Sequence, residues 1–204
     1  AADKFLKLSN LIPELDKSMQ AIVFCGDGST EDDDDGVIGD ELMIRDIEQA
    51  SALLDENDWI ACQFTYKETT TERKQILEDF KNGDINALVS IRVLDEGIDI
   101  PGVGIAILIA SSRNKRQYVQ RRGRVLRKSP NKAKALIYDF ICLPPQEAES
   151  SSLIDGEFER LIEMYRDCDN PQECDTFIDS IALDYPVHND LILHWRELKN
   201  VRTS

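Results

Sequence analysis

Ten lysines and arginines, with no acidic residue among them, lie between Arg113 and Lys134, here called the basic segment. Gln120, Arg124 and Arg127 are spaced at i, i+4 and i+7, so a helix would place them on one face. An arginine fork binds phosphate oxygens through two hydrogen bonds and stays charged when water is removed. Two such forks could stabilise the charge that develops on a γ-phosphoryl group during transfer. The alternative is a solvated helix face balanced by acidic neighbours.

A second polar stretch follows the apolar run at residues 87–91 and ends at Pro101. Within it, Gly97 would allow a ligand to approach the backbone closely. Asp99 could accept a hydrogen bond from a ribose hydroxyl or pair with an arginine. Taken alone, Asp99 is equally well explained as a structural cap.

The composition is that of a packed globular protein. Of 204 residues, 42% are hydrophobic and 31% are charged, with 10 glycines and 7 prolines, which excludes collagen-like and mostly disordered chains. No apolar run approaches the ~20 residues of a membrane helix, so no membrane partner is expected. Five cysteines without a CxxC pair, and no signal-like segment at the start, favour the cytoplasm.

The net charge is −15, which by itself argues against a nucleic-acid partner. This average conceals the basic segment, because the residues outside it together carry −25. A nucleic-acid partner therefore stays possible for one part of an acidic chain.

Apolar runs and helical patterns alternate along the first two thirds of the chain. Thr69 and Glu72 have the spacing of a capping box, and Gly83 stands where a helix would end. The alternation predicts an α/β domain with three layers, a parallel sheet between helices. Strands buried on both faces are predicted at residues 21–25, 59–64, 87–91, 103–109 and 135–141.

The pattern of residue types changes after the two prolines at positions 144 and 145. We expect residues 1–145 to form the α/β domain, opening with a helix at residues 3–15, and residues 146–204 to form a helical extension. The acidic, glycine-rich residues 27–40 predict a flexible loop.

No metal site is predicted. The carboxylates of residues 27–40 lack a fixed ligand geometry, and His188 and His194 have no third ligand nearby. We expect Cys25 to be a packed thiol rather than a nucleophile. Trp59 and Trp195 are expected in a core or a domain contact, with base stacking as the alternative.

The two polar stretches resemble motifs V and VI of the second, C-terminal RecA-like domain of superfamily 2 helicases and translocases. Residues 21–25 resemble motif IV, residues 90–101 motif V and residues 120–127 motif VI, in the family's order. The form Gln-Arg-x-Gly-Arg-x-x-Arg is similar to that of repair-type translocases and of the DEAD/DEAH-like motor subunits in restriction or phage defence. In such sheets, ligands bind at the carboxyl ends of the strands.

The resemblance implies a role for each matching residue. It implies catalytic arginines at Arg124 and Arg127, nucleotide contacts at Gly97, Asp99, Gln120 and Arg121, and nucleic-acid contacts at Ser90, Arg92, Arg113, Lys115 and Arg116. Two positions depart from the pattern. Ile91 stands where many members have threonine, and Leu126 replaces the glycine of the commoner motif VI.

The chain lacks a phosphate-binding loop, since none of its glycines is followed by lysine. Residues 93–96 superficially resemble a Walker B acidic pair but are better explained as part of motif V. The resemblance therefore implies that ATP and Mg²⁺ are bound mainly by an N-terminal RecA-like domain of the same full-length protein, and that this chain alone does not hydrolyse ATP. Nucleic acid is the implied partner, with DNA favoured.

Two other classes of function remain open. A non-enzymatic module could use the basic segment to bind nucleic acid or an acidic partner, with the RecA-like shape as a scaffold. An interaction protein could act through the helical extension, in which case the basic segment would be dispensable.

Overall fold

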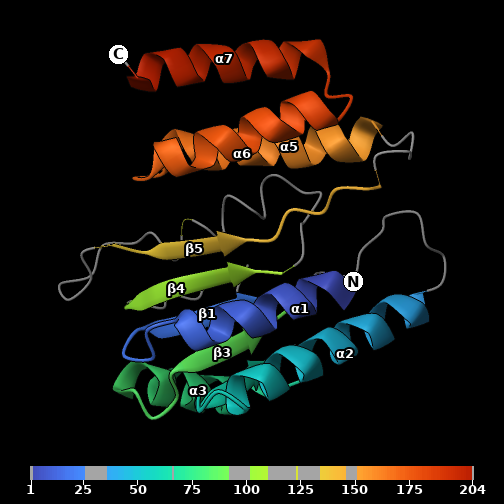
Figure 1. Ribbon diagram of the computed structural model, residues 1–204. Coiled ribbons are helices and arrows are strands. Elements are labelled where there is room, and N and C mark those ends of the chain that lie inside the picture. Colours follow the sequence, from blue (N-terminus) through green and yellow to red (C-terminus); the bar gives the residue numbers. More distant parts are fainter. Residues whose placement is uncertain are drawn as a thin grey trace. The chain divides into compact units, whose positions relative to one another are not determined.

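The computed structural model describes residues 2–25, 36–65, 67–91, 102–109, 123, 134–145 and 151–203. Its first part is built on a five-stranded sheet with the strand order β2-β3-β1-β4-β5 (Figure 1). Every neighbouring pair is parallel. The strands are β1 (Gln20–Phe24), β2 (Ala61–Phe64), β3 (Ala87–Ser90), β4 (Val103–Leu108) and β5 (Leu136–Asp139).

Helices cover both faces of this sheet, as the alternation predicts. Side chains of β1 alternate between two cores, with Val23 on one face and Ile22 on the other. Helices α1 (Ala2–Leu11) and α2 (Gly36–Asp55) cover the Val23 face. Helix α3 (Thr70–Asn82) covers the Ile22 face.

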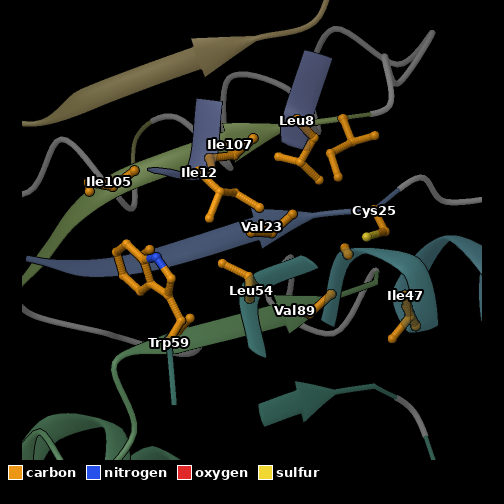
Figure 2. Packing of buried hydrophobic residues seen from close by; sticks show 14 of the residues in the cluster. Leu8, Ile12, Val23, Cys25, Ile47, Leu54, Trp59, Val89, Ile105 and Ile107 are labelled. Atoms are coloured by element: carbon orange, nitrogen blue, oxygen red, sulfur yellow. The ribbon is translucent and has the colours of Figure 1, made fainter. Parts of the chain in front are cut away.

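The core on the Val23 face joins the helices to the central strands. Figure 2 shows Leu8 and Ile12 of the first helical segment beside Ile107 of β4 and Val23 of β1, with Leu54 of α2 below them. All five side chains are fully buried. The large apolar area removed from water on this face holds α1, α2 and the sheet together.

Helix α3 shows how local sequence sets the length of an element. The Thr69 hydroxyl accepts a hydrogen bond from the Glu72 amide, and the Glu72 carboxylate accepts one from the Thr69 amide. At the other end, Gly83 has φ 86°, a left-handed conformation that favours glycine. Both predicted boundaries of this helix are confirmed.

Three details of the sequence prediction are wrong. β2 and β5 are the edge strands and are only partly buried, because an edge strand has one neighbour instead of two. Gly36–Asp40 belongs to α2 rather than to a loop. The first helix ends at Leu11 and is followed by a 3₁₀ turn, Ile12–Glu14, since Pro13 lacks the amide that an α-helix would need there.

The chain divides into two compact units, Ala1–Phe140 and Ile141–Ser204. The second, here called the helical unit, contains α5 (Ser151–Asp167), α6 (Pro171–Asp184) and α7 (Asn189–Thr203). At its centre the rings of Tyr165 and Trp195 meet edge to face, with centroids 4.6 Å apart.

Polar contacts join the three helices around this aromatic pair. The Trp195 indole and the Lys199 ammonium both donate to the Asp179 carboxylate, at 2.8 and 2.6 Å. Burial opposes the ionisation of Asp179, but these two donors outweigh it and hold its pKa below the ordinary value. On the other side, Arg202 donates to the backbone carbonyls of Tyr165 and Cys168.

A buried ion pair lies at the start of the helical unit. Arg160 donates to Glu157 at 2.6 Å, and both side chains are almost completely covered. The same carboxylate accepts the Cys142 amide at 3.0 Å, so it ties the chain before α5 to that helix. None of the helices in the described part of the chain is long and apolar enough to span a membrane.

The core on the Val23 face predicts a large difference between two truncations of similar size. Ile107→Ala should lower the free energy of unfolding by about 2–5 kcal/mol, because it leaves a cavity between β4 and α1. Leu6→Ala, at a side chain 60% exposed on α1, should change it by less than about 0.5 kcal/mol. Urea unfolding followed by circular dichroism measures both, and equal losses would contradict this core.

The helical unit should lose stability at alkaline pH. Burial, followed by the nearby Asp175 carboxylate, raises the pKa of Tyr165 to about 12. An unfolded tyrosine ionises near pH ~10, so the folded state resists a deprotonation that the unfolded state undergoes. The contribution is complete below pH ~10 and declines by up to about 2–3 kcal/mol as the pH rises to about 12.

Tyr165→Phe tests this pH dependence. Between pH ~10 and ~12 the variant should lose less stability than the unmodified chain, because it has no phenol at that position to ionise. Tyr185→Phe, at a partly exposed tyrosine of the same unit, is the matched control. Thermal unfolding across this pH range is the measurement, and parallel curves for all three proteins would rule out the effect.

Candidate functional site

The last residues of the five strands form one row at the carboxyl edge of the sheet. Register pairs Phe64 with Ser90, Ser90 with Phe24, Phe24 with Leu108, and Leu108 with Asp139. All strands are parallel, so the segments that follow them start from this one edge. The carboxyl edge is therefore the candidate functional site.

The two polar stretches start on opposite sides of β1. Residues 92–101 follow β3, and the chain that leads into the basic segment follows β4. β3 and β4 are the two neighbours of β1, so their carboxyl ends lie about 10 Å apart. A nucleotide is of that size, and a ligand above β1 could be reached from both stretches.

Ser90 is the one predicted site residue that belongs to a described strand. Its side chain is 1% exposed, and its hydroxyl has no hydrogen-bond partner within the described ranges. Its backbone carbonyl accepts the Cys25 amide at 3.0 Å, which extends the β1–β3 ladder by one bond. A covered, unsatisfied hydroxyl at this edge is a polar group in need of a partner.

The other predicted site residues lie outside the described residues. These are Arg92, Gly97, Asp99, Arg113, Lys115, Arg116, Gln120, Arg121, Arg124 and Arg127. Their topological position is still set by the strands on either side. The basic segment leaves the carboxyl end of β4 and must return to the amino end of β5, since these two strands are parallel.

A match to a known family decides the class of the protein. The family model described as the helicase conserved C-terminal domain matches residues 3–129. The chain belongs to this family. The matched range of this helicase C-terminal domain runs from α1 through β4 into the basic segment, and the helical unit lies beyond it.

Two relatives show what share of a longer protein's length this chain matches. The DNA 3'-5' translocase XPB2 of Sulfurisphaera tokodaii is 42% identical over 69 residues, which are 34% of this chain and 16% of that protein. Putative helicase 22 of a Sulfolobus islandicus filamentous virus is 30% identical over 131 residues, 61% of this chain and 23% of that protein. The chain thus spans less than a quarter of either relative.

Solved structures identify the fold of the helicase C-terminal domain. The C-terminal domain of the DEAD-box protein Dbp5 superposes with a TM-score of 0.52 at 18% identity, and the match covers 78% of this chain and 79% of that one. The parallel sheet with helices on both faces is therefore the RecA-like fold, as the sequence predicts.

Sequence reasoning missed two charged residues of the helicase C-terminal domain at the carboxyl edge. The Lys4 ammonium of α1 donates to the backbone carbonyl of Ile109 at 2.6 Å. Asp46 of α2 lies within electrostatic range of this ammonium group. Burial raises the pKa of Asp46 above its ordinary value, and the charge of Lys4 offsets part of that rise. No local motif could reveal them, because Lys4 and Ile109 are 105 positions apart.

The turn after β2 also belongs to this edge. Thr65 is buried, and its amide and hydroxyl both donate to the Glu68 carboxylate, at 2.6 and 2.9 Å. The hydroxyl in turn accepts the Lys67 amide at 3.2 Å. These bonds link Thr65, at the end of β2, to the residues just before α3.

The remaining candidates have structural explanations. Cys25 is 1% exposed within the core, so the prediction of a packed thiol is confirmed. Trp59 and Trp195 are buried in two cores, as expected. His188 and His194 are exposed. Within the described ranges, no three side chains of His, Cys, Asp or Glu are arranged to hold a metal ion.

Proposed function

We propose that this chain is the second motor domain of an ATP-dependent superfamily 2 helicase or translocase. In this proposal Arg124 and Arg127 reach the γ-phosphate of an ATP molecule bound between two RecA-like domains. The observation that carries it is the topology of the sheet: the chain that leads into the basic segment follows β4, which lies next to β1, in a chain of the helicase C-terminal family.

Topology supports the role of the arginines. In open parallel sheets, ligands bind outside the carboxyl ends of the strands, where neighbouring connections diverge. Gln120, Arg124 and Arg127 share a helical face, so one helix could present a hydrogen-bonding amide and two guanidinium groups to the same phosphates. Arg121 would support the same cleft.

The stretch after β3 would complete the nucleotide contacts. Gly97 and Asp99 follow β3 in the sequence, and the carboxyl end of β3 lies about 10 Å from that of β4. Glycine lets the backbone come close to the ligand, and a carboxylate is a suitable acceptor for a ribose hydroxyl.

The arginines that this proposal places at the phosphates fit a triphosphate and supply no ligand for its metal ion. Guanidinium groups attract phosphate oxygens and repel a divalent cation, whereas Mg²⁺ requires oxygen ligands. We therefore assign the phosphate loop and the Mg²⁺ ligands to an N-terminal RecA-like domain of the same full-length protein. Bound there, Mg²⁺ would neutralise charge on the β- and γ-phosphates while this chain adds the arginines.

Nucleic acid is the proposed second ligand, and DNA is favoured. Arg92, Arg113, Lys115 and Arg116 would bind backbone phosphates, with Ser90 as a further contact at the end of β3. The preference for DNA rests on a relative that is named a DNA translocase. For Ser90 to make this contact, its side chain must become accessible, because it is only 1% exposed.

We also propose that the protein works in the cytoplasm. None of the five cysteines forms a disulfide in the described part of the chain, which suits a reducing compartment.

This chain alone should not hydrolyse ATP, because it carries arginines for the phosphates but no loop that cradles them. Phosphate release should stay at the background rate with and without single-stranded DNA. The same assay on the protein that also contains the N-terminal domain is the positive control. Nucleic-acid-stimulated hydrolysis by this chain would refute the division of labour between two domains.

Arg127→Ala should abolish turnover in the two-domain protein. Loss of an arginine finger lowers kcat on the order of 10³-fold, while ATP affinity should change only a few fold. Arg166→Ala, at an exposed arginine of the helical unit, is the control and should hydrolyse ATP normally. If Arg127→Ala retains turnover, the assignment of Arg127 as an arginine finger is wrong.

A further inference from the structure

Two of the five cysteines lie beside each other at the turn between α5 and α6, two helices that pack together in the helical unit (Figure 1). Cys168 directly follows the last residue of α5, and Cys174 lies near the start of α6. Both are partly exposed, and both pack against the core of the helical unit. Burial, and after it the neighbouring Cys168, raises the pKa of the Cys174 thiol to about 11, so the two sulfurs lie within range of each other.

Hydrogen bonds hold both ends of this turn. The Arg202 guanidinium of α7 donates to the Cys168 carbonyl at 2.7 Å and to the Cys168 sulfur at 3.7 Å. The Cys168 thiol itself donates to the Tyr165 carbonyl at 3.2 Å. On the α6 side, the Asn170 side chain donates to the Glu173 carboxylate at 2.9 Å. Because the turn is already ordered, little further freedom is lost when the two sulfurs join.

The other three cysteines have no such neighbour. Cys25 and Cys62 belong to cores on opposite faces of the sheet. Cys142 precedes α5 and is not among the described residues that pack against the core of the helical unit. All five cysteines are in the described ranges, and only Cys168 and Cys174 share a core.

We propose that Cys168 and Cys174 form an oxidation site, at which a peroxide converts their two thiols into a disulfide that joins the end of α5 to the start of α6. The inference is independent of the motor function proposed above. In a reducing compartment the pair is a dithiol, and thiol reductants return the disulfide to that state.

The reaction with hydrogen peroxide has two steps. The Cys168 sulfur attacks one peroxide oxygen, an S–O bond forms as the O–O bond breaks, and the departing hydroxide takes the Cys168 proton and leaves as water. The Cys174 sulfur then attacks the Cys168 sulfenic acid, the S–S bond forms as the S–O bond breaks, and the Cys174 proton leaves with the hydroxide as a second water. Two electrons pass from the sulfurs to the peroxide.

The order of the two sulfurs follows from the environment of Cys174. The thiolate is the nucleophile, and a pKa of about 11 keeps Cys174 almost entirely in the thiol form. Cys168 therefore takes the first step. Its oxidation to a neutral sulfenic acid removes the charge that opposes deprotonation of Cys174, which assists the second step.

Peroxide treatment of the whole chain, followed by alkylation of the remaining thiols and mass spectrometry, tests the proposal. No lysine or arginine lies between Arg166 and Arg196, so trypsin leaves both cysteines on one peptide. That peptide should become lighter by two hydrogen atoms and carry no alkyl group, and dithiothreitol should restore both thiols. Its thiols should be lost at least about tenfold faster than that of Cys25, which is buried. Equal rates at all five cysteines, or disulfides only between separate chains, would overturn the inference.

Single replacements test the order of the steps. In Cys174→Ser, Cys168 should stop at the sulfenic acid, which dimedone traps, whereas Cys168→Ser should give at least about tenfold less adduct at Cys174. Cys142→Ser, at the third cysteine of the helical unit, is the matched control and should form the disulfide as the unmodified chain does. Equal adduct at Cys168 and Cys174 would refute the assigned order. If a variant fails to fold, the peptide from the unmodified chain still decides whether the disulfide forms.

Discussion

Burial of β1 on both faces and along both edges is the constraint on which the rest of the first unit depends. A strand in this position has no edge exposed to solvent, because β3 pairs with one edge and β4 with the other. The chain must therefore come back beside β1 twice, once for each of these strands. Since all the pairings are parallel, every return has to run from the carboxyl edge to the amino edge. The connections that contain the two polar stretches therefore begin on either side of the carboxyl end of β1.

The sequence predicts the layers well, because apolar runs and a capping box are local signals. It predicts the sheet edges poorly: β2 and β5 are mostly apolar, like the inner strands, and residue type does not report how many neighbours a strand has. The sequence does not predict the start of α2, because Gly36 and Gly39 are residues that favour a loop. Here the packing of the rest of the helix overrides the local preference.

The site is only partly accessible to such reasoning. Motif spacing singles out the arginines and Asp99, and topology brings their segments to one edge. Motif V predicts a nucleic-acid contact at Ser90 but does not encode burial, and the Ser90 hydroxyl is covered and has no hydrogen-bond partner within the described ranges. The hydrogen bond from Lys4 joins it to a residue 105 positions away, so this contact can be seen only in the folded structure.

Helix α1 also changes where the domain physically begins. The sheet needs no residue before Gln20 for its hydrogen bonds, and a shorter chain that opened with β1 would retain every strand pairing. Such a chain would nevertheless expose Val23 and Ile107 to water. It would also leave the Ile109 carbonyl, just after β4, without the Lys4 ammonium that donates to it. The smallest fragment of the first unit that keeps this core covered therefore includes α1 as well as the sheet, and a truncation that retains the motifs but removes α1 would lose that cover.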